Sequence, residues 1–243
     1  MKLHILAIAA HPDDVELGCA GTLIKHVQAG QAVGIIDLTQ GELGTRGNGA
    51  LRLQEAAKAA EVLGVAVREN AGMADGFFKN DEEHIKQLIV YLRHYQPDIV
   101  IANALEDRHP DHGRGGKLIA DACFFSGLRK IETFKDGVAQ APWRPKRVFH
   151  MIQDRTLPAT FIVDISTTHA KKMESVRCYG SQFHAPGSAE PLTYIATQKF
   201  LENIIGRDAL NGKMIGVEYG EAFICENLPG IDNLDCLLYP EYA

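Results

Sequence analysis

Two short motifs supply the residue types that metal and acid–base chemistry require. They are His11-Pro12-Asp13-Asp14 and His109-Pro110-Asp111-His112, and each comes after a short apolar run. Two histidines and one carboxylate are a frequent catalytic metal set, which leaves coordination positions open for water and substrate. The two motifs therefore predict a metal-dependent enzyme.

Six side chains in these motifs are candidates for the chemistry. The three that can bind a metal are His11, Asp14 and His112. The three that then stay free for proton transfer are Asp13, His109 and Asp111. An aspartate at a helix start is usually only a cap, and a lone loop histidine is usually only exposed. Two such clusters in one chain favour a functional site over that simpler explanation.

The segments that position the motifs alternate between apolar runs and amphipathic stretches. Buried strands are predicted at 3–9, 33–38 and 99–102, and helices at about 17–27, 56–63, 85–92 and 112–125. This order predicts an α/β fold with a Rossmann-like, mostly parallel sheet and helices on both faces. Ligands bind outside the carboxyl ends of the strands in such a sheet, so the loops after the three strands should form one site.

The second half of the chain is less regular. Residues 130–147 are predicted to be a long surface connection, followed by strands at 148–152 and 161–165 and by helices near 168–179 and 192–205. We expect this half to form the outer wall of the pocket, and residues 1–243 to make a single domain. His184 and Tyr194 lie in it, and an exposed loop and helix packing are the simpler explanations for them.

The composition excludes several classes of protein. The chain has 243 residues, 46% of them apolar and 23% charged, as in soluble globular proteins. It has 25 Lys and Arg against 31 Asp and Glu, so its net charge of −6 argues against general nucleic-acid or membrane binding. The five cysteines have no C-x-x-C spacing and indicate reduced thiols. We expect a cytoplasmic protein, and leave open whether it forms a homo-oligomer.

The two motifs resemble the signatures of the PIG-L/LmbE-like zinc deacetylases. The resemblance extends to Thr-Gln-Gly-Glu-Leu-Gly-Thr-Arg-Gly at 39–47, Arg-Leu-Gln-Glu-Ala at 52–56, Tyr-Gly-Ser-Gln at 179–182 and Gly-Val-Glu-Tyr-Gly-Glu-Ala-Phe at 216–223. Together these segments are similar to the branch that deacetylates N-acetylglucosaminyl-malate in bacillithiol biosynthesis. The resemblance implies a small-molecule N-acetylated amino sugar as substrate and Zn²⁺ as cofactor, with Fe²⁺ or another divalent metal as the alternative.

The resemblance also implies a role for each candidate residue. It makes His11, Asp14 and His112 the zinc ligands, Asp13 the general base, His109 a second catalytic histidine and Asp111 the partner of His109. Arg52 and Arg108 match positions near the substrate, and Arg46 is a further candidate contact. In the implied mechanism Asp13 takes a proton from the attacking water while a cationic His109 stabilises the oxyanion. Either residue then protonates the leaving amine.

Three other functions stay open on the sequence alone. One is deacetylation of another N-acetylglucosamine derivative, such as a chitooligosaccharide; a lipid-linked sugar fits the acidic chain less well. A second is a non-haem Fe(II) oxygenase, because two histidines and a carboxylate also form a facial triad; that function leaves Asp13, His109 and Asp111 unexplained. A third is a metal-free module that binds a sugar or a nucleotide.

Overall fold

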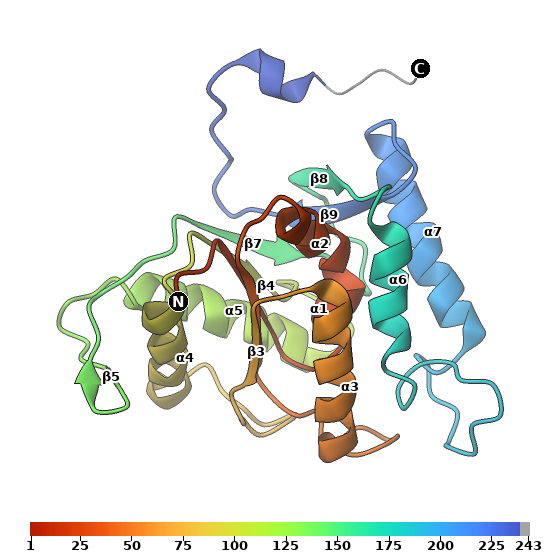
Figure 1. Cartoon of the computed structure of the whole chain (residues 1–243), viewed down its shortest axis with the longest axis horizontal. Helices are drawn as coiled ribbons and strands as arrows, with labels where there is room; N and C mark the ends of the chain where they lie inside the picture. The colour runs from red at the N-terminus through yellow and green to blue at the C-terminus, as the bar shows by residue number, and fades with distance from the viewer. Residues whose placement is uncertain (239–243) are drawn as a thin grey trace.

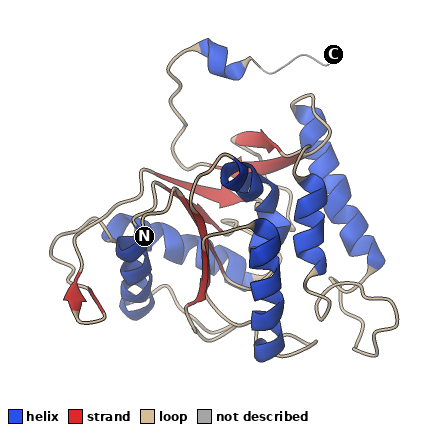
Figure 2. Ribbon diagram, in the orientation of Figure 1, coloured by secondary structure: helices blue, strands red, loops and turns tan. Residues whose placement is uncertain are grey.

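The computed structural model describes residues 1–238 and consists of a central sheet between helices (Figures 1 and 2). The seven-stranded sheet has the order β3-β2-β1-β4-β7-β9-β8. Its strands are β1 (Ile5–Ala9), β2 (Val33–Asp37), β3 (Val67–Asn70), β4 (Ile99–Ala102), β7 (Arg147–Met151), β8 (Phe161–Asp164) and β9 (Gly220–Ile224). Neighbours from β3 to β7 pair in parallel, and β9 is antiparallel to β7 and β8. The mostly parallel α/β fold is therefore confirmed.

The helices cover both faces of the sheet. They are α1 (Asp14–Gly18), α2 (Ala20–Gln28), α3 (Gly49–Leu63), α4 (Glu82–Tyr95), α5 (Pro110–Phe125), α6 (His169–Arg177) and α7 (Gln198–Met214). A small hairpin, β5 (Phe134–Lys135) and β6 (Val138–Ala139), and a 3₁₀ turn at Leu234–Leu237 complete the elements. None of the helices within residues 1–238 is long and apolar enough to span a membrane.

The buried strand β1 shows why the sheet needs two layers of helices. Successive strand residues point to opposite faces, and here Leu6 and Ile8 pack on the side of α4 and α5. Ile5 and Ala7 pack on the side of α1 and α2. A separate apolar cluster joins α3, α6 and α7, with the aromatic side chain of Phe200 among its members. That cluster places the second half of the chain beside the site.

Several predicted elements differ from the observed ones. The helix predicted over 17–27 is two helices, α1 and α2, because the backbone leaves the helical region at Cys19 (φ −149°). The helix predicted at 192–205 begins later, where the Thr197 side chain accepts a hydrogen bond from Phe200 N and caps α7. Strands β3 and β9 were not predicted at all. Cys19, Cys123, Cys178 and Cys225 are free thiols, as expected, and the side chain of Cys236 lies outside the described part of the structure.

Candidate active site

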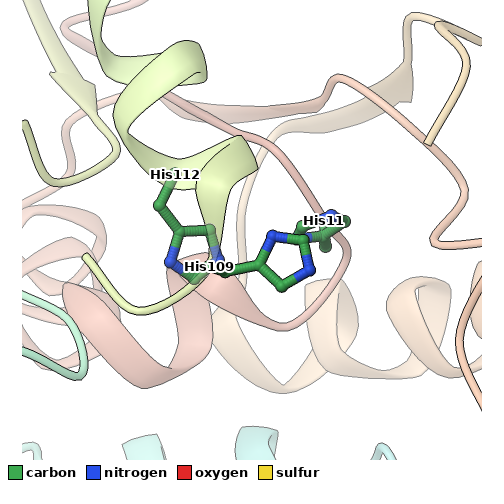
Figure 3. Close-up of side chains that lie close together, drawn as sticks. All are labelled: His11, His109 and His112. Atoms are coloured by element: carbon green, nitrogen blue, oxygen red, sulfur yellow. The ribbon is translucent and has the colours of Figure 1, made fainter. Parts of the chain in front are cut away.

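Three histidines meet at the carboxyl end of the sheet (Figure 3). His11 follows β1, while His109 and His112 lie at the start of α5, which follows β4. One ring nitrogen from each of the three lies within 4.8 Å of the others. The ring centroids are 4.7 Å apart for His11 and His109 and 5.2 Å apart for His109 and His112. Because β1 and β4 are adjacent parallel strands, their loops bring the two motifs together as predicted.

Asp14 lies between two of these histidines. Its carboxylate is 3.5 Å from His11 Nδ1 and 3.0 Å from His112 Nε2. The amides of Asn103 and Gln153 donate hydrogen bonds to the same carboxylate and fix its orientation. Burial opposes its charge, but the two histidines outweigh burial and hold the pKa of Asp14 well below its usual range. The carboxylate is therefore available as a ligand at neutral pH.

The far nitrogens of the two histidines are held by other carboxylates. His112 Nδ1 lies 2.5 Å from Asp107 Oδ2. His11 Nε2 lies 3.0 Å from Asp75 Oδ1 and 3.3 Å from Asp111 Oδ2. A carboxylate on the far nitrogen orients a metal-ligating histidine and fixes its tautomer. Here it leaves His11 Nδ1 and His112 Nε2 facing Asp14. Imidazole nitrogens and a carboxylate are ligand types that a divalent ion such as Zn²⁺ takes.

Asp13 is held in an unusual conformation beside this set. Its φ of 120° lies in the left-handed region, and its side chain does not cap α1. Instead its Oδ2 accepts a 2.6 Å hydrogen bond from Arg52 Nη2, and both side chains are buried. Burial raises the pKa of Asp13 to about 6, although the Arg52 guanidinium lowers it. A carboxyl group with a pKa near neutrality can take a proton and return it.

The structure places Asp111 differently from the expectation that it would hold His109. Its carboxylate contacts His11 Nε2, accepts from Gly76 N and pairs with Arg114. Only its backbone N–H reaches His109, donating to Nδ1 at 3.3 Å. Within residues 1–238 no ion pair to His109 is found, so the expected direct contact between the His109 and Asp111 side chains is not present in this structure.

A cationic His109 was also expected, and its surroundings argue against that charge. Burial lowers the pKa of His109, and the neighbouring His11 and His112 lower it further, which outweighs the opposing effect of the Asp111 and Asp14 carboxylates. Because Nδ1 accepts the backbone N–H of Asp111, the proton of the neutral ring belongs on Nε2. The neutral side chain therefore presents an N–H donor.

A cavity of about 410 Å³ opens over the cluster. Four arginines line it: Arg46, Arg52, Arg108 and Arg207. The first three were predicted as substrate contacts, and Arg207 was not. The remaining wall of the cavity includes the apolar side chains of Leu17, Ile195, Phe200 and Ile204. Tyr194, expected only to pack, also lines the cavity, whereas the exposed His184 does not.

Asp75, Asp107 and Gln153 are the functional neighbours that sequence reasoning missed. The first two hold the far nitrogens of His11 and His112, and Gln153 bonds to Asp14. Asp107 stands beside the second motif, and its position five residues before His112 was the available signal. Asp75 and Gln153 follow β3 and β7, at the same edge of the sheet as the motifs.

A family model described as PIG-L, GlcNAc-PI de-N-acetylase, matches residues 6–123. The diacetylchitobiose deacetylase of Thermococcus kodakarensis is 30% identical over 189 residues, which cover 74% of this chain and 70% of that protein. The 4-oxalmesaconate hydratase of Pseudomonas putida is 27% identical over 198 residues, 74% of each chain.

Two further comparisons bear on the fold and the branch. The crystal structure of the conserved protein TT1542 from Thermus thermophilus superposes with a TM-score of 0.83 at 33% identity, covering 94% of this chain and 97% of that one. A Bacillus anthracis protein, named probable N-acetyl-α-D-glucosaminyl L-malate deacetylase 2, is 28% identical over 147 residues, 54% of this chain and 64% of its own. The chain belongs to the PIG-L family.

Proposed function

We propose that the protein is a zinc-dependent hydrolase that removes the N-acetyl group from an N-acetylglucosamine conjugate. The observation that carries this proposal is the convergence of His11 Nδ1, His112 Nε2 and Asp14, with the far nitrogen of each histidine held by a carboxylate. Asp13 lies next to this set with a pKa of about 6. A metal-ligand set beside a positioned base is the arrangement that metal-dependent amide hydrolysis uses.

Each residue of the site has its own role in the proposed reaction. A divalent ion held by His11, Asp14 and His112 would polarise the acetyl carbonyl and lower the pKa of an attacking water toward ~7. Asp13 takes the proton of that water, and Arg52 holds its carboxylate in place. His109 donates Nε2–H to the developing oxyanion. Asp13 then returns the proton to the amine nitrogen as the C–N bond breaks, giving acetate and the free amino sugar.

We further propose N-acetylglucosaminyl-malate as the substrate, which would place the enzyme in bacillithiol biosynthesis. The named function of the Bacillus anthracis relative supports this choice, as does the presence of four arginines around one cavity. Diacetylchitobiose is the second candidate, because the Thermococcus relative carries that name at 30% identity. The hydratase among the relatives makes hydration of an unsaturated dicarboxylate a third reaction to measure.

Acetate release from a matched panel tests the proposal. The panel contains N-acetylglucosaminyl-malate, diacetylchitobiose, N-acetylglucosamine and an unsaturated dicarboxylate, each incubated with zinc-loaded and chelator-treated protein. We expect acetate from the malate conjugate with the zinc-loaded protein and none after chelation. Hydration of the dicarboxylate without acetate release from any sugar would overturn the deacetylase proposal. Activity that requires oxygen would favour the oxygenase instead.

A further inference from the structure

Three of the four arginines around the cavity already have a carboxylate partner. These pairs are Arg52 with Asp13 at 2.6 Å, Arg108 with Asp154 at 3.1 Å and Arg207 with Asp208 at 3.3 Å. Arg46 is the exception: within residues 1–238, no carboxylate lies within 4.0 Å of its guanidinium. Because the other charges are balanced inside the protein, Arg46 is the cation that remains for an anion from outside.

The guanidinium of Arg46 is also incompletely hydrogen-bonded. The residue is only 4% exposed, yet it lines the cavity. Its Nη2 donates to Ser188 Oγ at 2.9 Å, and its Nε is buried with no hydrogen-bond partner. A buried charge without a counter-charge, carrying an unsatisfied donor, destabilises the protein. A bound anion in the cavity would supply the missing counter-charge.

The loop that carries Arg46 is packed firmly against the second half of the chain. Gln182 donates a hydrogen bond to the backbone carbonyl of Arg46 at 2.9 Å. The next residue, Gly47, has a φ of 67°, and a Cβ atom there would lie only 2.9 Å from Ser181 Cβ. Only glycine allows the loop to approach so closely. The backbone of the loop that carries Arg46 is therefore held in place before any ligand arrives.

We propose that Arg46 is an anion-binding residue that takes a carboxylate on the part of the substrate beyond the acetylated sugar. This inference rests on the proposed function, because the acetyl group is taken to lie at the His11 and Asp14 cluster. A guanidinium matches a carboxylate with two parallel hydrogen bonds. Arg108, which the sequence favoured for this role, has a side chain 49% exposed, pairs with Asp154 and stacks on Tyr194.

Two substrates that differ only in charge test the proposal. They are an N-acetylglucosamine conjugate whose aglycone carries a carboxylate and the methyl ester of the same conjugate. With Arg46→Gln, kcat/KM for the carboxylate should fall roughly 10- to 100-fold, mainly through KM, because a charged hydrogen bond to the bound substrate is lost. The ester should change much less. Arg46→Lys keeps the charge but lacks the paired donors, so its kcat/KM for the carboxylate substrate should lie between those of the wild type and Arg46→Gln.

A structural role for Arg46 predicts different results. In that case Arg46→Gln would lower the melting temperature and reduce turnover of both substrates equally, and the proposal would be overturned. We expect an unchanged or higher melting temperature, because the substitution removes an unpaired buried charge. Arg108→Gln is the matched comparison. If it abolishes the preference for the carboxylate while Arg46→Gln does not, Arg108 reads the anion and the proposal is wrong.

Direct binding separates this proposal from the proposed function. If the wild-type protein releases acetate from neither conjugate, the deacetylase assignment fails, but calorimetric titration with L-malate still tests Arg46. Binding that Arg46→Gln weakens at least tenfold, at the lower end of the loss expected for a charged hydrogen bond, supports the anion site. Equal binding to both proteins overturns it. Titration with inorganic phosphate tests whether the site prefers a carboxylate or a phosphate. Tighter binding of phosphate than of L-malate would overturn the carboxylate assignment.

Discussion

The carboxylate of Asp111 lies 3.3 Å from His11 Nε2, across the gap between the two motifs. Asp111 is fully buried, and its other contacts are Gly76 N and Arg114. The second motif thus contributes His112, a candidate metal ligand. It also contributes Asp111, the side chain that orients His11, which is the candidate ligand from the first motif. The orientation of His11 in the first motif therefore depends on a side chain of the second motif.

Asp111→Asn should therefore weaken metal binding. An amide cannot accept a charge-assisted hydrogen bond from His11 Nε2, and loss of such an outer partner typically costs about 10- to 100-fold in metal affinity. Competition with a chromophoric chelator measures the zinc dissociation constant. Arg114→Gln is the control, because it removes another partner of Asp111 and leaves His11 untouched. Unchanged zinc affinity with reduced turnover would instead restore Asp111 as the partner of His109.

The proposed ligands themselves should show a larger effect. We expect His11→Ala, Asp14→Ala and His112→Ala each to lose bound zinc together with activity, since three protein ligands are the usual minimum for a catalytic zinc. Elemental analysis of the purified variants measures the zinc content. His109→Ala distinguishes the two histidines of the second motif: we expect it to keep zinc. If it loses the metal as well, His109 is a metal ligand. Its position in the histidine cluster also allows that role.

The parts of the site that could be predicted follow from topology. His11 and His112 meet because their loops leave adjacent parallel strands. A βαβα pattern predicts that such loops open at one edge of the same sheet, although the adjacency of β1 and β4 comes from the structure. Asp75 could not be found in this way, because β3 is half-buried and carries Arg68 and Glu69, so the apolar run that indicates a buried strand is missing. A strand that is not predicted gives no loop to search.

The misassigned partner of His109 has a different cause. Asp111 follows His109 by two positions, and the family resemblance implied a side-chain pair between them. His109 is the N-cap of α5, where the backbone turns into the helix, and its ring faces back to the N–H of Asp111. Residues two apart at a helix start do not face each other. The carboxylate of Asp111 instead contacts His11.

Next to Arg207 in the cavity wall, the buried ion pair of Lys172 and Asp208 should contribute to stability. Lys172 is fully buried and lies 2.7 Å from Asp208 and 2.9 Å from Glu221. Asp208→Asn leaves this ammonium undercompensated, which should lower the free energy of unfolding by about 3–5 kcal/mol. Urea denaturation at neutral pH measures the change. Lys86→Gln, at an exposed pair on α4, is the control and should stay close to wild type.

The same pair predicts a pH dependence. Burial alone would raise the pKa of Asp208, but Lys172 and Arg207 outweigh burial and hold it well below its usual range. A carboxyl group whose pKa is depressed by folding stabilises the folded state above its ordinary pKa, and this stabilisation is lost as the pH falls. The difference between wild type and Asp208→Asn should therefore shrink as the solution is acidified below about pH 4. A constant difference would mean that Asp208 acts through packing alone.

Asp13→Asn is the substitution that separates the base from the ligands. The amide is nearly isosteric, can still accept from Arg52 Nη2, and lies outside the proposed metal-ligand set, so zinc should remain bound. It cannot take a proton from water, and we expect turnover to fall by ~10²–10⁴, the usual contribution of a positioned base. Acetate release normalised to zinc content measures this, with Asp81→Asn at the exposed N-cap of α4 as the control. Loss of zinc equal to that of Asp14→Ala would make Asp13 a ligand. Full activity with zinc retained would mean that Asp13 is not the general base.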